Sequence, residues 1–417
     1  MTTEALKTGI PEWAAGLLSS DLREQERCAV EIRRLLSSGD SKVPFEDLIQ
    51  AGVVPSLVKL LTKPSLQEDA VWALSNLASG PSKSSKALID HGAIPALVQL
   101  LSTTNDVVIQ DHAVMGLGNL ASGNGDAIVK AGGLTTLLDL LQEPRQSLDM
   151  VRQATWALGM LYREPPNTLD SIQQALPTLQ KLLDHKDEEV LGDTVWAYAH
   201  ILADSSDIHN IIGAVVESGD GKVVSKLVEF LHNDNTSIQR AALKALAGIA
   251  AGNDHHIQSI LDCKNSLTDL QKVIAAGDNE EEALRVVANL CGGITSIQVV
   301  IDSEIVRFLM QMIQNGGAPL WKKKPAAEGI LCLARSANTA QMRYLISEGY
   351  EKWKTTMTEL VPNLPPPRIN INSKRSSSSL GDSTKLAASP KRPKAKEAAA
   401  SQSAKWQRKE GERLERN

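Results

Sequence analysis

The chain has 417 residues, of which 42% are hydrophobic but only 3% aromatic, and it carries a net charge of −5. This composition favours helices packed through Ala, Leu and Val, and it argues against a β-sandwich, whose strands are rich in aromatic and β-branched residues. The first residues lack the basic start and apolar core of a signal peptide, and no run of about 18 apolar residues occurs, so we expect neither secretion nor a membrane span.

Charge is distributed unevenly along the chain. Residues 366–417 carry 13 Lys and Arg against 5 Asp and Glu, so this tail has a charge of +8 and residues 1–365 have −13. The tail is rich in Ser, Lys, Ala and Pro and shows no apolar periodicity. We therefore expect it to be disordered.

Eight segments of the body can be laid over one another, from CAVEIRRLLSSG at Cys28 to AAEGILCLARSA at Ala326. One column of this overlay holds Glu31, Trp72, Met115, Trp156, Trp196, Lys244, Arg285 and Glu328. Neighbouring members of the column lie 40 to 48 residues apart, which is the period of armadillo and HEAT repeats.

A second motif, as in HGAIPALVQLL, lies between these segments and brings a glycine every 40 residues. These glycines are Gly52, Gly92 and Gly132. Because Gly favours helix ends and Pro favours helix starts, we expect three helices in each repeat. The first would end at the glycine, the second would begin near Pro55 or Pro95, and the third would carry the shared column.

The third helices have small and apolar residues at spacings of three and four, which forms a stripe that one repeat cannot bury alone. Stacking the repeats buries this stripe. The sequence therefore predicts an all-α solenoid of armadillo-type repeats over residues 1–365, with the third helices lining its inner face. It would contain about eight repeats and a partial ninth, TAQMRYLISEGYEKW.

Several segments resemble the importin alpha family of nuclear import adaptors, over about residues 10–355. The segments are PFEDLIQAGVVPSLVKLL, VWALSNLASG, HGAIPALVQLL, TWALGMLYREPPN, EEVLGDTVWAYAHILAD and TSIQRAALKALAGIAAGND. The resemblance implies a right-handed superhelical solenoid that holds a Lys- and Arg-rich nuclear localisation signal extended along its concave groove. It also implies protein import into the nucleus and a location in the cytoplasm and the nucleus.

The resemblance further implies which residues bind the peptide. Asn side chains of the third helices would pair with the peptide backbone, since an amide both donates and accepts, and Trp rings would hold the stems of lysines. Trp72 and Asn76 keep the family's pair, four residues apart on one helix face. The implied peptide-binding residues are Trp72, Asn76, Gly80, Ser85, Asn119, Trp156, Trp196 and Asn289.

Some positions depart from the family. Met115 replaces a family Trp, and Met160 replaces a family Asn. Gly123 stands where the family has an acidic residue that selects lysine, so Asp126, a few residues on, is the candidate acidic contact.

The second, smaller peptide site of the family departs further. Arg285 and Glu328 occupy positions of family Trp residues, which leaves Asn289 as the main survivor. We expect this smaller site to be lost or altered.

The chain starts directly at the first repeat, and we expect it to lack the family's N-terminal arm that binds importin beta. The expected partners are cargo proteins with basic nuclear signals, and importin beta would need another route of recruitment. The alternative is a family-derived armadillo scaffold that has lost transport and binds another partner. Binding of a lysine-rich signal peptide separates these two hypotheses.

The tail holds a basic pattern that matches a nuclear signal. Its cations are Lys374, Arg375, Lys391, Arg392 and Lys394. One hypothesis is that this segment folds back into the acidic body as an internal substitute for cargo, and the other is that it is a solvated linker. Trp406 is the tail's only aromatic residue, so we do not expect nucleic acid as a partner.

Catalytic and metal-binding patterns are missing from the sequence. Gly116 and Gly118 lack the third glycine and the preceding strand of a dinucleotide-binding motif. His255 and His256 are adjacent, which on a helix points them apart, so we expect both to face solvent and to share no metal. The sequence therefore predicts no enzymatic activity, no cofactor and no metal.

Overall fold

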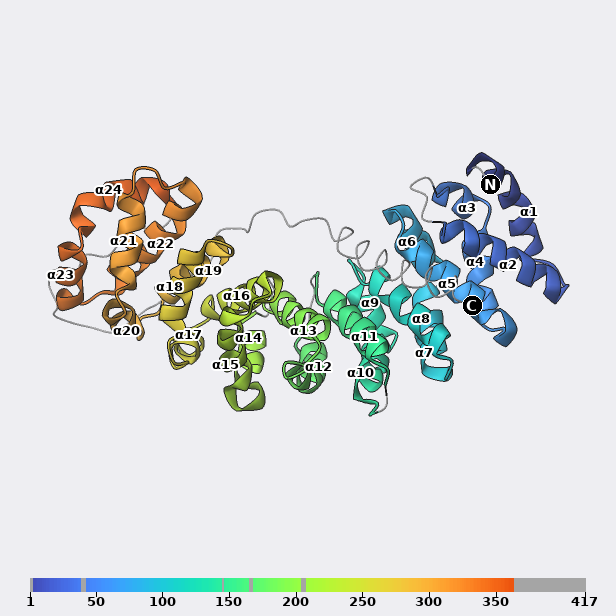
Figure 1. Ribbon diagram of the computed structural model, residues 1–417, viewed down its shortest axis with the longest axis horizontal. Coiled ribbons are helices and arrows are strands. Elements are labelled where there is room, and N and C mark those ends of the chain that lie inside the picture. The colour runs from blue at the N-terminus through green and yellow to red at the C-terminus, as the bar shows by residue number, and fades with distance from the viewer. Residues whose placement is uncertain (1–2, 39–42, 145, 165–167, 204–207, 364–417) are drawn as a thin grey trace, which may run out of the picture. The chain divides into compact units, whose positions relative to one another are not determined.

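The computed structural model describes residues 3–38, 43–144, 146–164, 168–203 and 208–363 (Figure 1). These residues form helices joined by turns, and none of them forms a strand, which confirms the all-α prediction. They divide into two compact units, which we call unit 1 (up to residue 164) and unit 2 (from residue 168). The tail at 366–417, together with the disorder predicted for it, lies outside the described residues.

Unit 1 holds eleven described α-helices and one described 3₁₀ turn. They are α1 (Thr3–Gly16), α2 (Leu22–Leu36), α3 (Phe45–Gln50), α4 (Val53–Leu60), η1 (Pro64–Leu66), α5 (Gln67–Ala78), α6 (Ser82–Asp90), α7 (Ala93–Thr103), α8 (Val107–Leu120), α9 (Gly125–Lys130), α10 (Gly133–Gln142) and α11 (Leu148–Leu161). The third helices of successive repeats are α2, α5, α8 and α11, and each packs against the next.

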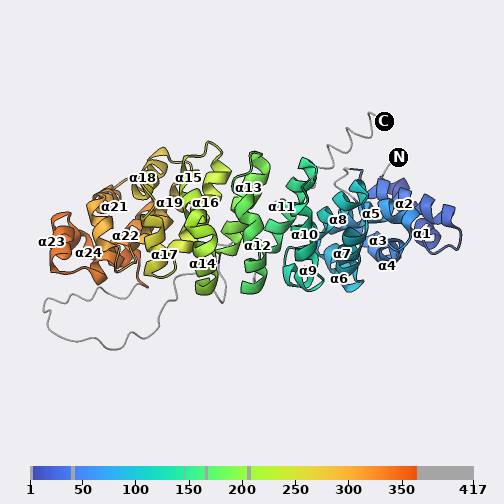
Figure 2. The same cartoon turned by 90° about the horizontal axis from the view of Figure 1, so that it is seen from below.

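Unit 2 continues the repeats with thirteen described α-helices and two described 3₁₀ turns. They are α12 (Leu169–Leu182), α13 (Glu188–Ile201), α14 (Ile208–Glu217), η2 (Ser218–Gly221), α15 (Lys222–Glu229), η3 (Phe230–His232), α16 (Thr236–Ala250), α17 (Asp254–Leu261), α18 (Ser266–Ala276), α19 (Glu280–Leu290), α20 (Ile297–Asp302), α21 (Ile305–Gln314), α22 (Leu320–Ser336), α23 (Thr339–Ser347) and α24 (Tyr350–Leu360). Its third helices α13, α16, α19 and α22 also pack in sequence (Figure 2).

The three-helix pattern of the repeats follows from the predicted glycines. Gly52, Gly92 and Gly132 have φ angles of 76°, 75° and 86°, a left-handed conformation that breaks the first helix and starts the second. The fifth repeat departs from this pattern, because Gln174 stands three residues before Pro177, where a glycine precedes Pro95. Without a glycine the helix is not broken, and α12 runs through as one element.

Each third helix is held by a stripe of buried small and aliphatic side chains. In α5 the residues Ala70, Ala73, Leu74 and Leu77 are fully buried. A buried Leu contributes roughly 1.5–3 kcal/mol, and the alanines let neighbouring helices approach closely. The predicted inter-repeat stripe is therefore present within each unit, while one continuous solenoid over residues 1–365 stays a prediction.

Candidate functional site

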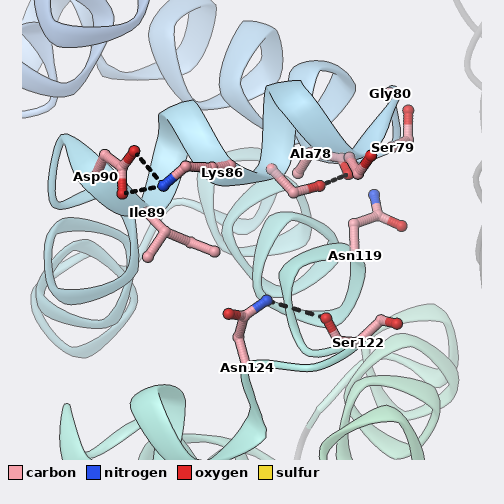
Figure 3. A pocket seen from close by; sticks show the side chains of 11 residues that line it. Ala78, Ser79, Gly80, Lys86, Ile89, Asp90, Asn119, Ser122 and Asn124 are labelled. Carbon is pink, nitrogen blue, oxygen red and sulfur yellow. Dashed lines mark hydrogen bonds and ion pairs between the residues drawn. The ribbon is translucent and has the colours of Figure 1, made fainter.

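A pocket of about 330 Å³ opens in unit 1 where the ends of α5 and α8 meet α6 (Figure 3). It brings together three of the predicted peptide-binding residues, Gly80, Ser85 and Asn119. The full lining is Ala78, Ser79, Gly80, Ser82, Ser85, Lys86, Ile89, Asp90, Asn119, Ser122 and Asn124. Most of these side chains are small or polar, so the pocket suits a hydrogen-bonding ligand more than an apolar one.

Gly80 and Ser85 shape one wall of the pocket. A Cβ at Gly80 would lie 2.7 Å from the Phe45 ring, so only a glycine leaves room for this approach. The Ser85 hydroxyl donates to the Ala78 carbonyl oxygen at 3.4 Å and thereby links α6 to the end of α5. Lys86 and Asp90 form an exposed ion pair of 3.0 Å beside them.

Asn119 carries an acceptor that the fold leaves open. Its Nδ2 donates to the Ser75 carbonyl oxygen of α5 at 3.4 Å, yet its Oδ1 accepts no hydrogen bond from any described residue. The residue is only 6% exposed and lines the pocket. A buried acceptor without a partner costs about 1–3 kcal/mol, so this atom needs a donor that the described residues do not supply, which is a water molecule or a ligand.

The other predicted Asn residues share the same bridging geometry. Asn76 Nδ2 donates a hydrogen bond of 2.9 Å to the hydroxyl of Ser37, the residue at the C-terminal end of the preceding third helix. In unit 2 Asn289 donates its Nδ2 to the Ala247 carbonyl oxygen of α16 at 2.9 Å. Each predicted Asn therefore reaches back to the preceding repeat, a structural role that the sequence pattern did not reveal.

Trp72 is enclosed by charged and aromatic neighbours. It is 5% exposed, with the Arg33 guanidinium 4.5 Å from the ring centre and the His112 ring stacked on it at 4.4 Å. Arg33 also pairs with Asp69 at 2.8 Å. Burial raises the pKa of Asp69, while Arg33 opposes this shift. An internal cation thus already lies on the ring predicted to hold a peptide lysine.

Trp156 is also buried, at 7% exposure, and it packs on the preceding third helix. A Cβ at Gly118 would overlap the Trp156 ring, so the tryptophan can pack here only because residue 118 is a glycine. Neither Trp72 nor Trp156 lines the pocket described above.

The remaining predicted tryptophan, Trp196, lies in unit 2 and is half-buried. Its Nε1 donates to the Ser237 hydroxyl of α16 at 3.2 Å, and its ring is tilted against His200 at 5.7 Å. It therefore joins α13 to α16. Trp196 and Asn289 belong to unit 2, so they form no part of the unit 1 pocket.

Besides Asp90, which lines the pocket and pairs with Lys86, a second carboxylate lies close by, that of Glu164, which sequence reasoning missed. Its Oε1 accepts from the Ser122 hydroxyl at 2.9 Å, and its Oε2 lies 3.4 Å from where a Cβ of Gly123 would stand. Asp126, the predicted acidic contact, instead pairs with Lys130 at 2.6 Å. Glu164 was overlooked because it comes from the end of the following repeat, 42 positions after Ser122.

The five predicted tail cations, Lys374, Arg375, Lys391, Arg392 and Lys394, lie outside the described residues. Among the residues that are described, no three His, Cys, Asp or Glu side chains are grouped so that they could hold a metal ion. No described helix is long and apolar enough to span a bilayer.

The expectation for the two adjacent histidines was half wrong. His255 is exposed, but His256 is buried because it caps its own helix. Its Nδ1 accepts from the Asn253 N–H at 3.3 Å, and its own N–H donates to Asn253 Oδ1 at 3.1 Å. A Gln or Glu usually holds this position of a capping box, which is why the histidine gave no signal.

Comparison with known proteins agrees with this architecture. The Armadillo/beta-catenin-like repeat family matches residues 41–79, 81–122 and 124–160. The crystal structure of an engineered protein aligns over 87% of either chain with a TM-score of 0.73 and 29% identity. Computationally designed armadillo repeat proteins for modular peptide recognition align over 57% of this chain and 99% of theirs, with a TM-score of 0.50 and 27% identity.

Two sequence relatives carry the family assignment. Importin subunit alpha-1a of Oryza sativa subsp. japonica is 36% identical over 311 residues, which cover 71% of this chain and 57% of that protein. Importin subunit alpha-3 of Arabidopsis thaliana is 37% identical over 263 residues, which cover 62% of this chain and 48% of that protein. The chain thus spans about half the length of these curated relatives. Its repeats, helices and relatives agree, and the chain belongs to the importin alpha family of armadillo-repeat proteins.

Proposed function

We propose that the chain is an adaptor that binds basic nuclear localisation signal peptides for import into the nucleus. The observation that carries the proposal is Asn119 Oδ1, a buried acceptor that no described residue satisfies, on a residue that lines the pocket. A backbone N–H of an extended peptide would satisfy it, and the Asn119 Nδ2 is already held by Ser75 in a fixed orientation.

Glu164 would supply the charge that selects lysine. It lies beside Ser122, which lines the pocket, so a lysine ammonium in the pocket would come within reach of its carboxylate. A charge-assisted hydrogen bond of this kind contributes about 1.5–3 kcal/mol. Asp126 would contribute less, because Lys130 already neutralises it.

The proposed function requires binding and release but no catalysis, and it places the protein in the cytoplasm and the nucleus. Its partners would be cargo proteins with exposed Lys- and Arg-rich segments. Recruitment of importin beta is a separate proposal, which a pull-down with the full chain would test. The designed armadillo proteins made for peptide recognition support the general mode of binding.

The test is the affinity of a fluorescent lysine-rich signal peptide, measured by anisotropy with the full chain. Glu164→Gln keeps the acceptor for Ser122 but removes the charge, so we expect about tenfold weaker binding. Asp126→Asn is the matched control and should weaken binding less than about twofold, since that carboxylate is already paired with Lys130. Absence of binding by the unmodified chain, or a loss in Asp126→Asn with none in Glu164→Gln, would refute the proposal.

A further inference from the structure

Two third helices of unit 2 carry cations in the repeat column that holds Trp72, Trp156 and Trp196. These cations are Lys244 on α16 and Arg285 on α19, and the column ends at Glu328 on α22. Arg240 lies four residues before Lys244 and shares its helix face. The helices α16 and α19 pack side by side (Figure 1). Arg240 and Lys244 both pair with Glu282 of α19, so these two cations and Arg285 form one patch, which we call the basic ridge.

The cations of the basic ridge are more exposed to solvent than Glu282, the carboxylate that two of them share. The side chains of Arg240, Lys244 and Arg285 are 48%, 46% and 47% exposed, whereas Glu282 between them is 19% exposed. Glu281 is exposed like the cations, and the half-buried Glu328 of α22 lies near enough to Arg285 for the two charges to interact. A ligand approaching the ridge therefore meets guanidinium and ammonium groups ahead of Glu282.

The internal ion pairs of the ridge are long, and one carboxylate is shared. Arg240 and Lys244 both form ion pairs with Glu282, at 3.4 Å and 3.9 Å respectively. Arg285 forms an ion pair of 3.6 Å with Glu281. Optimal charge-assisted hydrogen bonds measure about 2.7–2.9 Å. Exposed pairs contribute only about 0.2–1 kcal/mol, so the cations can exchange these partners at little cost.

Neighbouring residues on the ridge are already oriented for a ligand. Arg240 Nε donates to Asn279 Oδ1 at 3.0 Å, and the buried Asn279 is itself fixed to the Thr236 carbonyl and to Gln239. On the next turn after Arg285, Asn289 is held by its bond to Ala247. An Asn amide has a second N–H and an oxygen besides such a bond, which can pair with a peptide backbone.

We propose that the basic ridge of unit 2 binds an extended acidic peptide. Arg240, Lys244 and Arg285 bind its carboxylate side chains, and Asn289 pairs with its backbone. Arg guanidinium groups suit this role because their planar fork matches a carboxylate. The site is separate from the pocket of unit 1 and takes a ligand of opposite charge, so the two proposals stand or fall independently.

The test uses the full chain and a fluorescent glutamate-rich peptide, with binding measured by anisotropy at low ionic strength. Lys244→Glu with Arg285→Glu should weaken binding at least about tenfold. Lys222→Glu with Lys264→Glu is the matched control, because these exposed lysines of unit 2 lie off the third helices and the net charge change is the same. The control should lose less than about twofold, and added salt should weaken the unmodified chain's binding.

Two further measurements keep the result interpretable. Lys244→Gln with Arg285→Gln makes no new charge clash with Glu281 or Glu282, and it should also weaken binding more than the control. The affinity for the lysine-rich peptide should not fall in either ridge variant, which separates this site from the unit 1 pocket. No binding of the acidic peptide at low salt, or equal losses in the ridge and control variants, would overturn the proposal.

Discussion

The Arg33 guanidinium lies 4.5 Å from the centre of the Trp72 ring and 2.8 Å from the Asp69 carboxylate. Arg33 comes from the preceding repeat, so one repeat places a cation where the family resemblance would place a lysine of the cargo. A peptide lysine must therefore displace Arg33 before it can use Trp72. This competition makes the tryptophan position weaker than the sequence alone indicates.

Removing that internal cation should strengthen the binding of a basic peptide. Arg33→Met keeps an apolar stem but gives up a cation–π contact of about 0.5–1 kcal/mol, so we expect an affinity increase of about threefold. Arg34→Met on the same helix is the control, since Arg34 is exposed and pairs with Glu31. Titration with the lysine-rich peptide measures both variants, and weaker binding by Arg33→Met would contradict the competition.

Lys86 should also oppose a basic ligand, because its ammonium lines the pocket. Lys86→Gln is expected to raise the affinity for a lysine-rich peptide by a few fold at low salt, with a smaller gain at high salt. Lys83 is as exposed as Lys86 and lies on the same helix, but it does not line this pocket. Lys83→Gln should therefore have a smaller effect. Equal gains in the two variants would show that only net charge matters.

Gly118 should tolerate no side chain, because Trp156 fills the space beside it. Gly118→Ala forces the ring to move and should destabilise unit 1 by about 1–3 kcal/mol. Gly192→Ala is the matched control in α13, where the new Cβ would meet Ile238 only at an ordinary 3.6 Å. That change should be neutral or stabilising by up to about 1 kcal/mol, because Ala favours helix. Urea denaturation measures both, and a stable Gly118→Ala would contradict the packing.

His256 should make unit 2 less stable in acid. Burial lowers the pKa of His256 below its ordinary value of 6.5, and the neighbouring His255 and His209 lower it further, while Glu217 opposes them. The unfolded chain then binds more protons than the folded chain, so stability is lost as the pH falls below 6.5. Protonation would also end the acceptance of the Asn253 N–H by Nδ1.

The variant His256→Gln tests this pH dependence. Gln can take the same place in the capping box without titrating, so the loss of thermal stability between about pH 7 and pH 5 should become smaller. His255→Gln, at the exposed neighbour, should keep most of the loss, because burial of His256, the largest cause of the lowered pKa, is unchanged. Melting curves at both pH values measure the difference, and an unchanged acid response in His256→Gln would contradict the assignment.

The fold was largely predictable because it repeats. One column aligned over eight segments and a glycine that recurs three times at a spacing of 40 reinforce each other, and Gly52, Gly92 and Gly132 take the left-handed conformation that the pattern requires. The merged helix α12 shows the limit of this reasoning. One Gln in place of a glycine changes a helix boundary, although the repeat period persists.

The site was less predictable, because its properties depend on contacts between repeats. The resemblance to the importin alpha family pointed to Asn119 and Ser85, but Glu164 reaches Ser122 across 42 positions and Arg33 reaches Trp72 across a repeat boundary. Periodicity predicts which residues share a helix face. It does not predict which cation or carboxylate of a neighbouring repeat contacts that face. These partners decide how strongly a basic ligand can bind.

The central claim is that Asn119 serves a ligand more than it serves the fold, and Asn119→Ala tests it most directly. The change removes a buried acceptor that no described residue satisfies, at the cost of one 3.4 Å bond to Ser75. We predict a melting temperature that is unchanged or higher, together with about tenfold weaker binding of the lysine-rich peptide. Unchanged peptide affinity in Asn119→Ala, or no binding by the unmodified chain, would contradict the account.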